Sequence, residues 1–301
     1  MTRVIRLLAS ALILCAAVVA LDAQSKPRLL TVDDIYNPGR RLNFSGTPQA
    51  GVTWIDPRTY LTIRRANGGA EWITVDADSG RTSPLFDADR MQAALAALPG
   101  VTREEASLLS RSSDLILNPA RSGALVTIAS DLYFYDFGSS KVTRLTSEGG
   151  EEELASFSPD GTRVAFVRAN NLHTVDVASG QQRPLTSDGS PELLNGKLDW
   201  LYQEEIYGRG QFRGYWWSPD STSLAFLQLD ERPVPEYTVV DHIPYRPTLE
   251  VTDYPKAGDP NPIVKLGVGR AGQGGPAWVD FGAYSKIEFL VVNVGWTADS
   301  R

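Results

Sequence analysis

Short runs in which apolar and polar residues alternate recur along the chain, each followed by a turn rich in Gly, Ser and Asp. The segment DLYFYDFGSSKVTRLTSEGG, residues 131–150, aligns without a gap with NLHTVDVASGQQRPLTSDGS, residues 171–190, at an offset of 40. A third copy, EWITVDADSGRTSPLF at 71–86, aligns with residues 171–186 at an offset of 100. Alternation with a period of two is typical of a strand. Each copy therefore predicts a strand, a tight turn and a second short strand.

Further strands are predicted where an apolar run follows a proline turn. These runs are FSPDGTRVAFVR from residue 157, WSPDSTSLAFLQ from 217 and the more divergent NPARSGALVTIA from 118. Proline fixes φ in such a turn and glycine accepts the left-handed conformation. A period near 40 built from short strands is typical of a β-propeller, with one four-stranded sheet per repeat. We therefore expect an all-β fold, an incomplete β-propeller, with a β-sandwich as the alternative.

Two intervals are longer than the repeat and predict insertions. Asp76 and Asp136 are 60 residues apart, as are Phe157 and Trp217. The first insertion, at about 87–112, is predicted to be helical, because Met91, Leu95 and Leu98 fall at helical spacing and Thr102 with Glu105 forms a capping-box pattern. The second lies at about 191–212. Insertions on a regular scaffold are a common place for function.

The second insertion contains DWLYQEEIYGRG, residues 199–210, in which two acids follow each other within an aromatic frame formed by Trp200, Tyr202 and Tyr207. On a strand, Glu204 and Glu205 would point to opposite faces, so they could meet one ligand only from a helical turn or a bent loop. Two nearby carboxylates repel each other unless a cation lies between them. An ammonium group, with three N–H donors, fits that requirement. A solvated acidic face is the alternative.

The N-terminus predicts export. Arg3 and Arg6 precede an apolar run that ends near Leu21, and Ala23 is a plausible cleavage point. This pattern predicts a signal peptide at 1–23 and a periplasmic or secreted protein, with an uncleaved signal that anchors the chain in the membrane as the alternative. Residues 24–50 form an N-terminal segment, and residues 51–301 form the propeller region.

The amino-acid composition limits the kinds of site and partner that the chain is expected to have. The only cysteine, Cys15, lies inside the signal, so the mature chain has no thiol for disulfides, metal binding or catalysis. The net charge of -7 argues against a nucleic-acid partner. We expect no metal and no cofactor, because the acids at blade positions, Asp131, Asp136 and Asp176, are better placed to close turns. A structural role is predicted for His173 and His242, which fall in strand-like stretches.

The segment from Asp199 to Tyr237, followed by YPKAGDPNPIVKLGV from Tyr254, resembles the propeller of dipeptidyl peptidase IV and its bacterial relatives in the prolyl oligopeptidase superfamily. The shared patterns are Asp-Trp-x-Tyr-x-Glu-Glu, Trp-Trp-Ser-Pro-Asp and Tyr-Pro-Lys-Ala-Gly, in that order. The resemblance implies an eight-bladed propeller in which Glu204 and Glu205 bind the N-terminal ammonium of a peptide. It also implies removal of N-terminal dipeptides after Pro or Ala. A homodimer is a further partner that it allows.

The same resemblance implies that catalysis belongs to an α/β-hydrolase domain with a Ser-Asp-His triad. These 301 residues contain no Gly-x-Ser-x-Gly elbow, so we expect a chain truncated before that domain and no catalytic residue in it. The family also uses an arginine to hold the substrate carbonyl. Arg103 and Arg111 in the helical insertion are candidates by location. The alternative function is a stand-alone periplasmic propeller of the TolB type that binds a protein partner.

Overall fold

The computed structural model describes residues 29–37, 39, 51–66 and 69–301, and its contacts divide the chain into Met1–Val52 and Thr53–Arg301. The first part contains helix α2 (Val32–Tyr36), which Thr31 caps by accepting a hydrogen bond from the Asp34 N–H at 3.3 Å. The predicted signal peptide, residues 1–23, lies outside the described residues. Within the described ranges, no helix combines the length and the apolar character needed to span a membrane.

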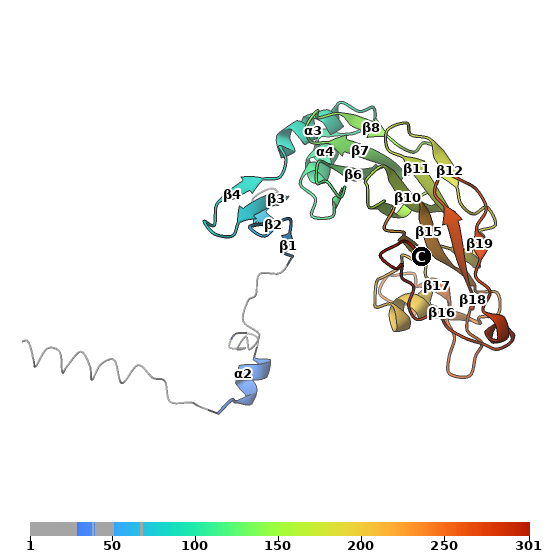
Figure 1. The fold of residues 1–301 in the computed structure, drawn as a ribbon. Coiled ribbons are helices and arrows are strands. Elements are labelled where there is room, and N and C mark those ends of the chain that lie inside the picture. The colour runs from blue at the N-terminus through green and yellow to red at the C-terminus, as the bar shows by residue number, and fades with distance from the viewer. Residues whose placement is uncertain (1–28, 38, 40–50, 67–68) are drawn as a thin grey trace, which may run out of the picture. The chain divides into compact units, whose positions relative to one another are not determined.

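The second part consists mainly of antiparallel sheets, with four sheets of at least four strands among its described residues (Figure 1). The first two sheets contain β1 (Thr53–Trp54), β2 (Thr59–Ala66), β3 (Gly69–Asp76) and β4 (Thr82–Pro84), then β5 (Ile116–Leu117), β6 (Gly123–Ile128), β7 (Asp131–Asp136) and β8 (Val142–Arg144). The third contains β9 (Glu153–Phe157), β10 (Arg163–Arg168), β11 (Asn171–Asp176) and β12 (Gln182–Pro184). The fourth contains β13 (Leu193–Asn195), β14 (Tyr215–Trp217), β15 (Ser223–Asp230), β18 (Ile263–Arg270) and β19 (Ala277–Trp278).

The three sequence copies fold in the same register. Val75 pairs with Thr82, Tyr135 with Val142, and Val175 with Gln182. In each copy an aspartate closes the turn between the two strands, because its carboxylate accepts from the N–H and the hydroxyl of the serine three residues later. This is the role predicted for Asp136 and Asp176, whereas Asp131 instead forms an ion pair with Arg144.

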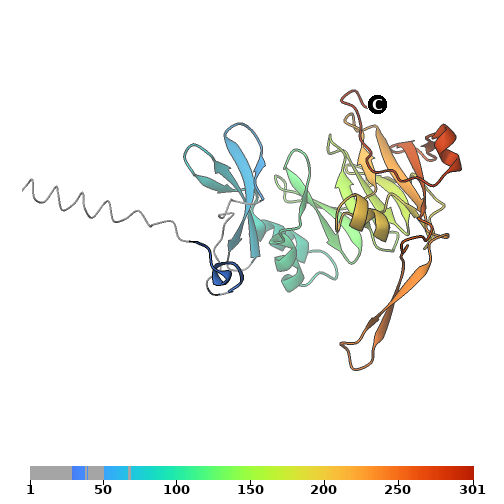
Figure 2. The same ribbon diagram turned by 90° about the horizontal axis from the view of Figure 1, so that it is seen from below.

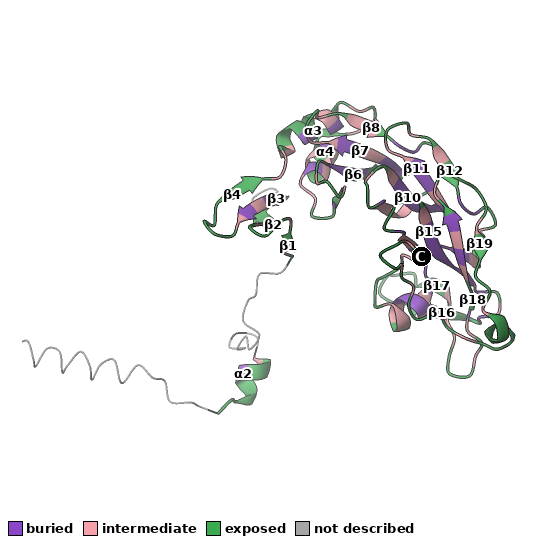
Figure 3. Cartoon of the chain, viewed as in Figure 1, coloured by how far each residue is buried: buried purple, intermediate pink, exposed green. Residues whose placement is uncertain are grey.

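Strand β10 shows how the sheets pack, because both of its faces are buried. Val164 and Phe166 belong to a core cluster with Leu125 and Leu132 of the second sheet. Ala165 and Val167 point to the opposite face and belong to a cluster with Tyr215 and Phe226 of the fourth sheet. The third sheet thus packs against a neighbouring sheet on either side, as in a propeller, whereas each sheet of a β-sandwich has one solvated face. Figure 3 shows the resulting buried band through the central strands.

The helical insertion consists of α3 (Ala88–Ala96) and α4 (Arg103–Ser110). Met91 and Leu95 are fully buried and pack in one cluster with Ala124 and Val126 of β6. Of the predicted capping box, one hydrogen bond is present, from the Glu105 N–H to the Thr102 hydroxyl at 3.1 Å. The helices therefore extend the core of the second sheet.

A long hairpin, β16 (Glu236–Asp241) with β17 (Thr248–Asp253), interrupts the fourth sheet between β15 and β18. All of β16 is exposed, as are Thr248–Val251 of β17. Figure 2 shows this hairpin, in orange, projecting away from the sheets. The chain then returns to the fourth sheet and continues through a short 3-10 helix, η2 (Gly282–Lys286).

Candidate functional site

The segment that contains Glu204 and Glu205 is an excursion from the first strand of the fourth sheet. Strands β13 and β14 both pair with β15: Asn195 lies opposite Gln228, and Tyr215 lies opposite Phe226. They behave as one strand that is interrupted between Gly196 and Gly214. The sequence places the insertion at about 191–212, a few residues earlier, because the pairing of β13 with the distant β15 has no local sequence signal.

Glycines form the neck of this excursion, where its two ends meet. The Gly214 N–H donates to the Gly196 carbonyl at 2.9 Å. Gly196 has φ of +73°, and a Cβ there would lie 3.2 Å from Leu172 Cδ1. A Cβ on Gly214 would lie 2.9 Å from Leu198 Cδ2. Both ends therefore need a residue without a side chain, which lets the two backbones approach each other.

The acids lie on a helical turn, η1 (Tyr202–Ile206), with π-type hydrogen bonding. The Tyr207 N–H donates to the Tyr202 carbonyl at 2.8 Å, and Asp199 Oδ1 accepts from the Tyr202 N–H at 2.9 Å. Short π-helical turns occur often at functional sites. Glu204 and Glu205 therefore lie on a helical turn and not on a strand, where adjacent side chains would point to opposite faces.

Two tyrosines of the aromatic frame anchor the turn to the core. Tyr202 is fully buried, and its hydroxyl accepts from the Val291 N–H at 3.2 Å. The Tyr207 hydroxyl donates to the Val291 carbonyl at 3.2 Å, and its ring packs on Trp216 with centroids 5.6 Å apart. Burial raises the pKa of Tyr207 to about 12 and that of Tyr202 further, so both stay protonated. The tyrosines therefore hold the turn in place.

The third aromatic residue, Trp200, connects the turn to the long hairpin. Its ring lies 4.3 Å, between centroids, from that of Tyr254, which in turn lies 5.6 Å from Tyr237 at the base of the hairpin. The Lys256 ammonium lies 4.4 Å from the centre of the Tyr237 ring. This stack joins two segments that are far apart in the sequence.

The two adjacent acids differ in their surroundings. The Glu204 side chain is 15% exposed and forms an ion pair with the guanidinium of Arg209. Glu205 is exposed and forms no ion pair with any residue that the structure describes. The pair thus has one carboxylate that already has a counter-ion and one that is open to a cationic ligand.

Two buried acids below the turn were not predicted from the sequence. Asp199 is 4% exposed, and its Oδ2 atom is buried without a hydrogen-bond partner in the described part of the chain. Glu231, which follows β15, is 7% exposed. Burial raises the pKa of Asp199 to about 6. Burial and the nearby charge of Asp199 raise the pKa of Glu231 to about 8, so a proton remains on this pair at neutral pH.

The remaining candidates from the sequence have structural surroundings. The Arg111 guanidinium pairs with Asp89 and donates to Gln92 at 2.8 Å, so it ties α4 to α3, while Arg103 is exposed. His173 stacks on Phe166 with centroids 5.4 Å apart, and burial lowers its pKa to about 4. His242 lies in the exposed loop after β16 and not in a strand. Within the described ranges, no three His, Cys, Asp or Glu side chains gather as a metal site.

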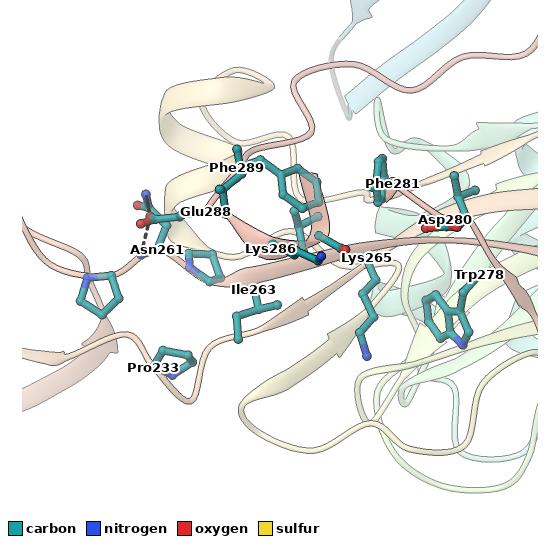
Figure 4. A pocket seen from close by; sticks show the side chains of 16 residues that line it. Pro233, Asn261, Ile263, Lys265, Trp278, Asp280, Phe281, Lys286, Glu288 and Phe289 are labelled. Carbon is teal, nitrogen blue, oxygen red and sulfur yellow. Dashed lines mark hydrogen bonds between the residues drawn. The ribbon is translucent and has the colours of Figure 1, made fainter. Parts of the chain in front are cut away.

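A pocket of about 720 Å³ lies beside the last strand of the fourth sheet. Three prolines, Ile263, Trp278, Phe281 and Phe289 are among the apolar residues that line it (Figure 4). Its polar groups include Lys265, Lys286 and Glu288, and the last accepts a hydrogen bond from Asn261. Neither Glu204 nor Glu205 lines this pocket. It is an apolar concavity separate from the acid pair.

Comparison with known proteins places this fold and this segment in one family. The family described as the dipeptidyl peptidase IV (DPP IV) N-terminal region matches residues 126–301. A probable dipeptidyl peptidase 4 of Aspergillus clavatus is 35% identical over 177 residues, which are 56% of this chain and 22% of that protein. Dipeptidyl aminopeptidase B of Saccharomyces cerevisiae is 38% identical over 141 residues, 45% of this chain and 17% of that protein. The chain therefore spans about a fifth of the length of these relatives.

A solved structure supports the same family. The crystal structure of Porphyromonas gingivalis dipeptidyl peptidase 4 superposes with a TM-score of 0.58 and 25% identity, over 81% of this chain and 34% of that one. The family match covers more than half of the chain, including every strand from β7 onward and the segment between Gly196 and Gly214 that contains Glu204 and Glu205. The chain belongs to the family of dipeptidyl peptidase IV N-terminal regions.

Proposed function

We propose that this chain is the substrate-binding propeller of a secreted serine dipeptidyl peptidase, and that Glu204 and Glu205 bind the N-terminal ammonium of a peptide. The observation that carries the proposal is the anchored turn: two consecutive acids lie on one helical turn, and the hydroxyl groups of Tyr202 and Tyr207 tie it to Val291. A free α-amino group titrates near 7.7 to 8.0, so at neutral pH it is mostly a cation. Two fixed carboxylates can share its three N–H donors.

Binding the amino group would also set where a peptide is cut. A peptide whose first nitrogen is held can extend only a fixed distance toward the nucleophile, so cleavage falls at a fixed residue. We assign the nucleophile to an α/β-hydrolase domain of the same polypeptide, and the removal of dipeptides after Pro or Ala to the complete enzyme. In this proposal the propeller sets the distance from the bound amino group to the cleaved peptide bond, and it also controls the access of the substrate to the nucleophile.

The test is binding of the dipeptide Gly-Pro, which has no peptide bond beyond its second residue, measured by calorimetry beside N-acetyl-Gly-Pro. Glu204→Gln or Glu205→Gln removes a charge-assisted hydrogen bond and should weaken Gly-Pro binding by about one to two powers of ten. The double variant should lose more than either. Glu250→Gln on the exposed β17 is the matched control. Equal losses for both ligands would show that the acids are structural.

We also propose a second copy of the chain as a partner, through the hairpin. Thr238 and Val240 of β16 lie opposite Val251 and Leu249 of β17, so Val240, Leu249 and Val251 form an apolar stripe on one face, beside the Thr238 side chain. Leu249 is 67% exposed. Exposed apolar faces on a projecting hairpin mark interaction sites, and a stripe with apolar residues from both strands can pair with its own copy.

Export is proposed from residues 1–23 alone. Sequencing the N-terminus of the mature protein tests it: a start near Gln24 supports cleavage, and a start at Met1 or Thr2 in the membrane fraction supports the anchor.

A further inference from the structure

Arg209 follows the acid-bearing turn in a loop whose ends are both fixed. At one end the Tyr207 N–H donates to the Tyr202 carbonyl at 2.8 Å. At the other, the Gly210 N–H donates to the Gln203 side-chain carbonyl at 2.8 Å, and Gln203 is 6% exposed. The loop is therefore held over the turn, and the position of Arg209 next to Glu204 follows from its backbone.

The contact itself is an ion pair between the Arg209 guanidinium and Glu204 Oε1. The arginine side chain is 85% exposed, and it has no second acidic partner in the described part of the chain. Gly208 and Gly210 flank it with φ of +108° and +83°, and both have open space where a Cβ would be. Because the flanking residues have no side chains and the arginine itself is exposed, the Arg209 side chain has room to rotate away from Glu204 while the loop keeps its backbone hydrogen bonds.

We propose that Arg209 is an internal counter-ion of Glu204, which a peptide's N-terminal ammonium must displace when it binds. The inference rests on the proposed function, because it assigns that same carboxylate to the ligand. A guanidinium and an ammonium compete for the same carboxylate oxygen and repel each other. The arginine side of the pair is open to solvent, which weakens the ion pair, so Arg209 lowers affinity without blocking the site. It also makes the acids unequal, with Glu205 as the first contact for the ligand.

The test is a double-mutant cycle on Glu204 and Arg209, with the dissociation constant of Gly-Pro as the measurement. Arg209→Gln should tighten binding about two- to five-fold at low salt, which corresponds to the strength of an ion pair whose arginine is open to solvent. The gain should shrink as salt is raised. In the Glu204→Gln background, Arg209→Gln should tighten binding less. N-acetyl-Gly-Pro should respond to none of these changes.

Arg58→Gln is the matched control, since it removes one exposed, ion-paired arginine from the turn before β2 and changes the net charge equally. Unchanged or weaker Gly-Pro binding by Arg209→Gln overturns the inference. If Glu205→Gln still weakens Gly-Pro binding in that case, the proposed function stands and only the role of Arg209 is wrong. If Glu205→Gln has no effect on a protein that binds Gly-Pro, the proposed function itself fails.

Discussion

At the scale of single residues, the blade turns require one left-handed residue, and the sequence meets this requirement unequally. Gly80, Ser140 and Gly180 occupy the same turn position in the three copies, with φ of +68°, +58° and +69°. Their N–H groups donate to the carbonyls of Asp76, Asp136 and Asp176 at 2.8 to 2.9 Å. Glycine adopts this conformation without the steric cost that a Cβ imposes. Ser140 is therefore the strained member of the set.

Ser140→Gly should stabilise the protein by about 0.5 to 1 kcal/mol, because it removes that steric cost. Gly180→Ala should destabilise it by a similar amount, since a Cβ there has space, with its nearest neighbour 3.9 Å away, and only φ is unfavourable. The midpoint of urea unfolding measures both changes. A destabilised Ser140→Gly variant would mean that the serine makes a contribution other than its backbone conformation.

Glu231 predicts a pH dependence of stability. A carboxyl whose pKa is raised on folding keeps its proton where the unfolded chain has lost it, so stability falls as pH rises from about 4.3. The fall ends near pH 8, the pKa of the folded form. Its slope is at most about 1.4 kcal/mol per pH unit. Asp199, Asp253 and Glu192 oppose ionisation of Glu231, while Lys197 favours it.

Glu231→Gln should remove most of this dependence and raise the melting temperature at pH 8 more than at pH 5. The exposed Glu250→Gln is the control, with no such difference expected. A Glu231→Gln variant with the same pH profile as the parent would show that another group carries the effect.

At the scale of elements, the neck of the excursion decides whether the acids are held in place. Gly214→Ala should displace the turn, because the new methyl group would lie 2.9 Å from Leu198 and 3.3 Å from the Gly196 backbone. We expect at least a ten-fold loss of Gly-Pro binding, with a fold that remains largely intact by circular dichroism. Gly138→Ala is the control, since a Cβ there meets its nearest neighbour at an ordinary 3.6 Å. Unchanged binding by Gly214→Ala would separate the neck from the site.

The helices and strands also show which features of the fold and of the candidate site could be predicted from the sequence. The blade hairpins were predictable because their signals are local: alternation, an aspartate with a serine three residues later, and a left-handed residue. The predicted helices lie at α3 and α4 for the same reason. The anchoring of the turn was not predictable, because Val291 is 89 residues from Tyr202 and no motif links them. The proximity of Asp199 and Glu231 likewise depends on the fold. Arg209 lies close to Glu204 in the sequence, but no sequence pattern predicted the ion pair between them.

At the scale of the whole molecule, the hairpin is the element least explained by the propeller alone. It adds no strand to the fourth sheet, and the sheet closes by pairing β15 directly with β18 over eight residue pairs. An element that the scaffold does not need, and that exposes apolar side chains, is better explained by a partner. The stack of Trp200, Tyr254 and Tyr237 places its base against the acid-bearing turn.

If the hairpin joins two copies, charges on its apolar stripe should separate them. Leu249→Lys places a charge opposite Val240 on the stripe, and a two-fold interface would bury one such charge from each copy. Sedimentation velocity should then show a shift from dimer to monomer. Thr248→Lys is the control, because neighbouring residues on a strand point to opposite faces, and it should leave the dimer intact.

If the parent protein is a monomer at every concentration, or if both variants dissociate equally, the stripe is not the interface. If Leu249→Lys is monomeric and also binds Gly-Pro more weakly, the stack of Trp200, Tyr254 and Tyr237 links the hairpin to the acid-bearing turn. Tyr254→Leu should then reproduce the weaker binding in a protein that remains a dimer.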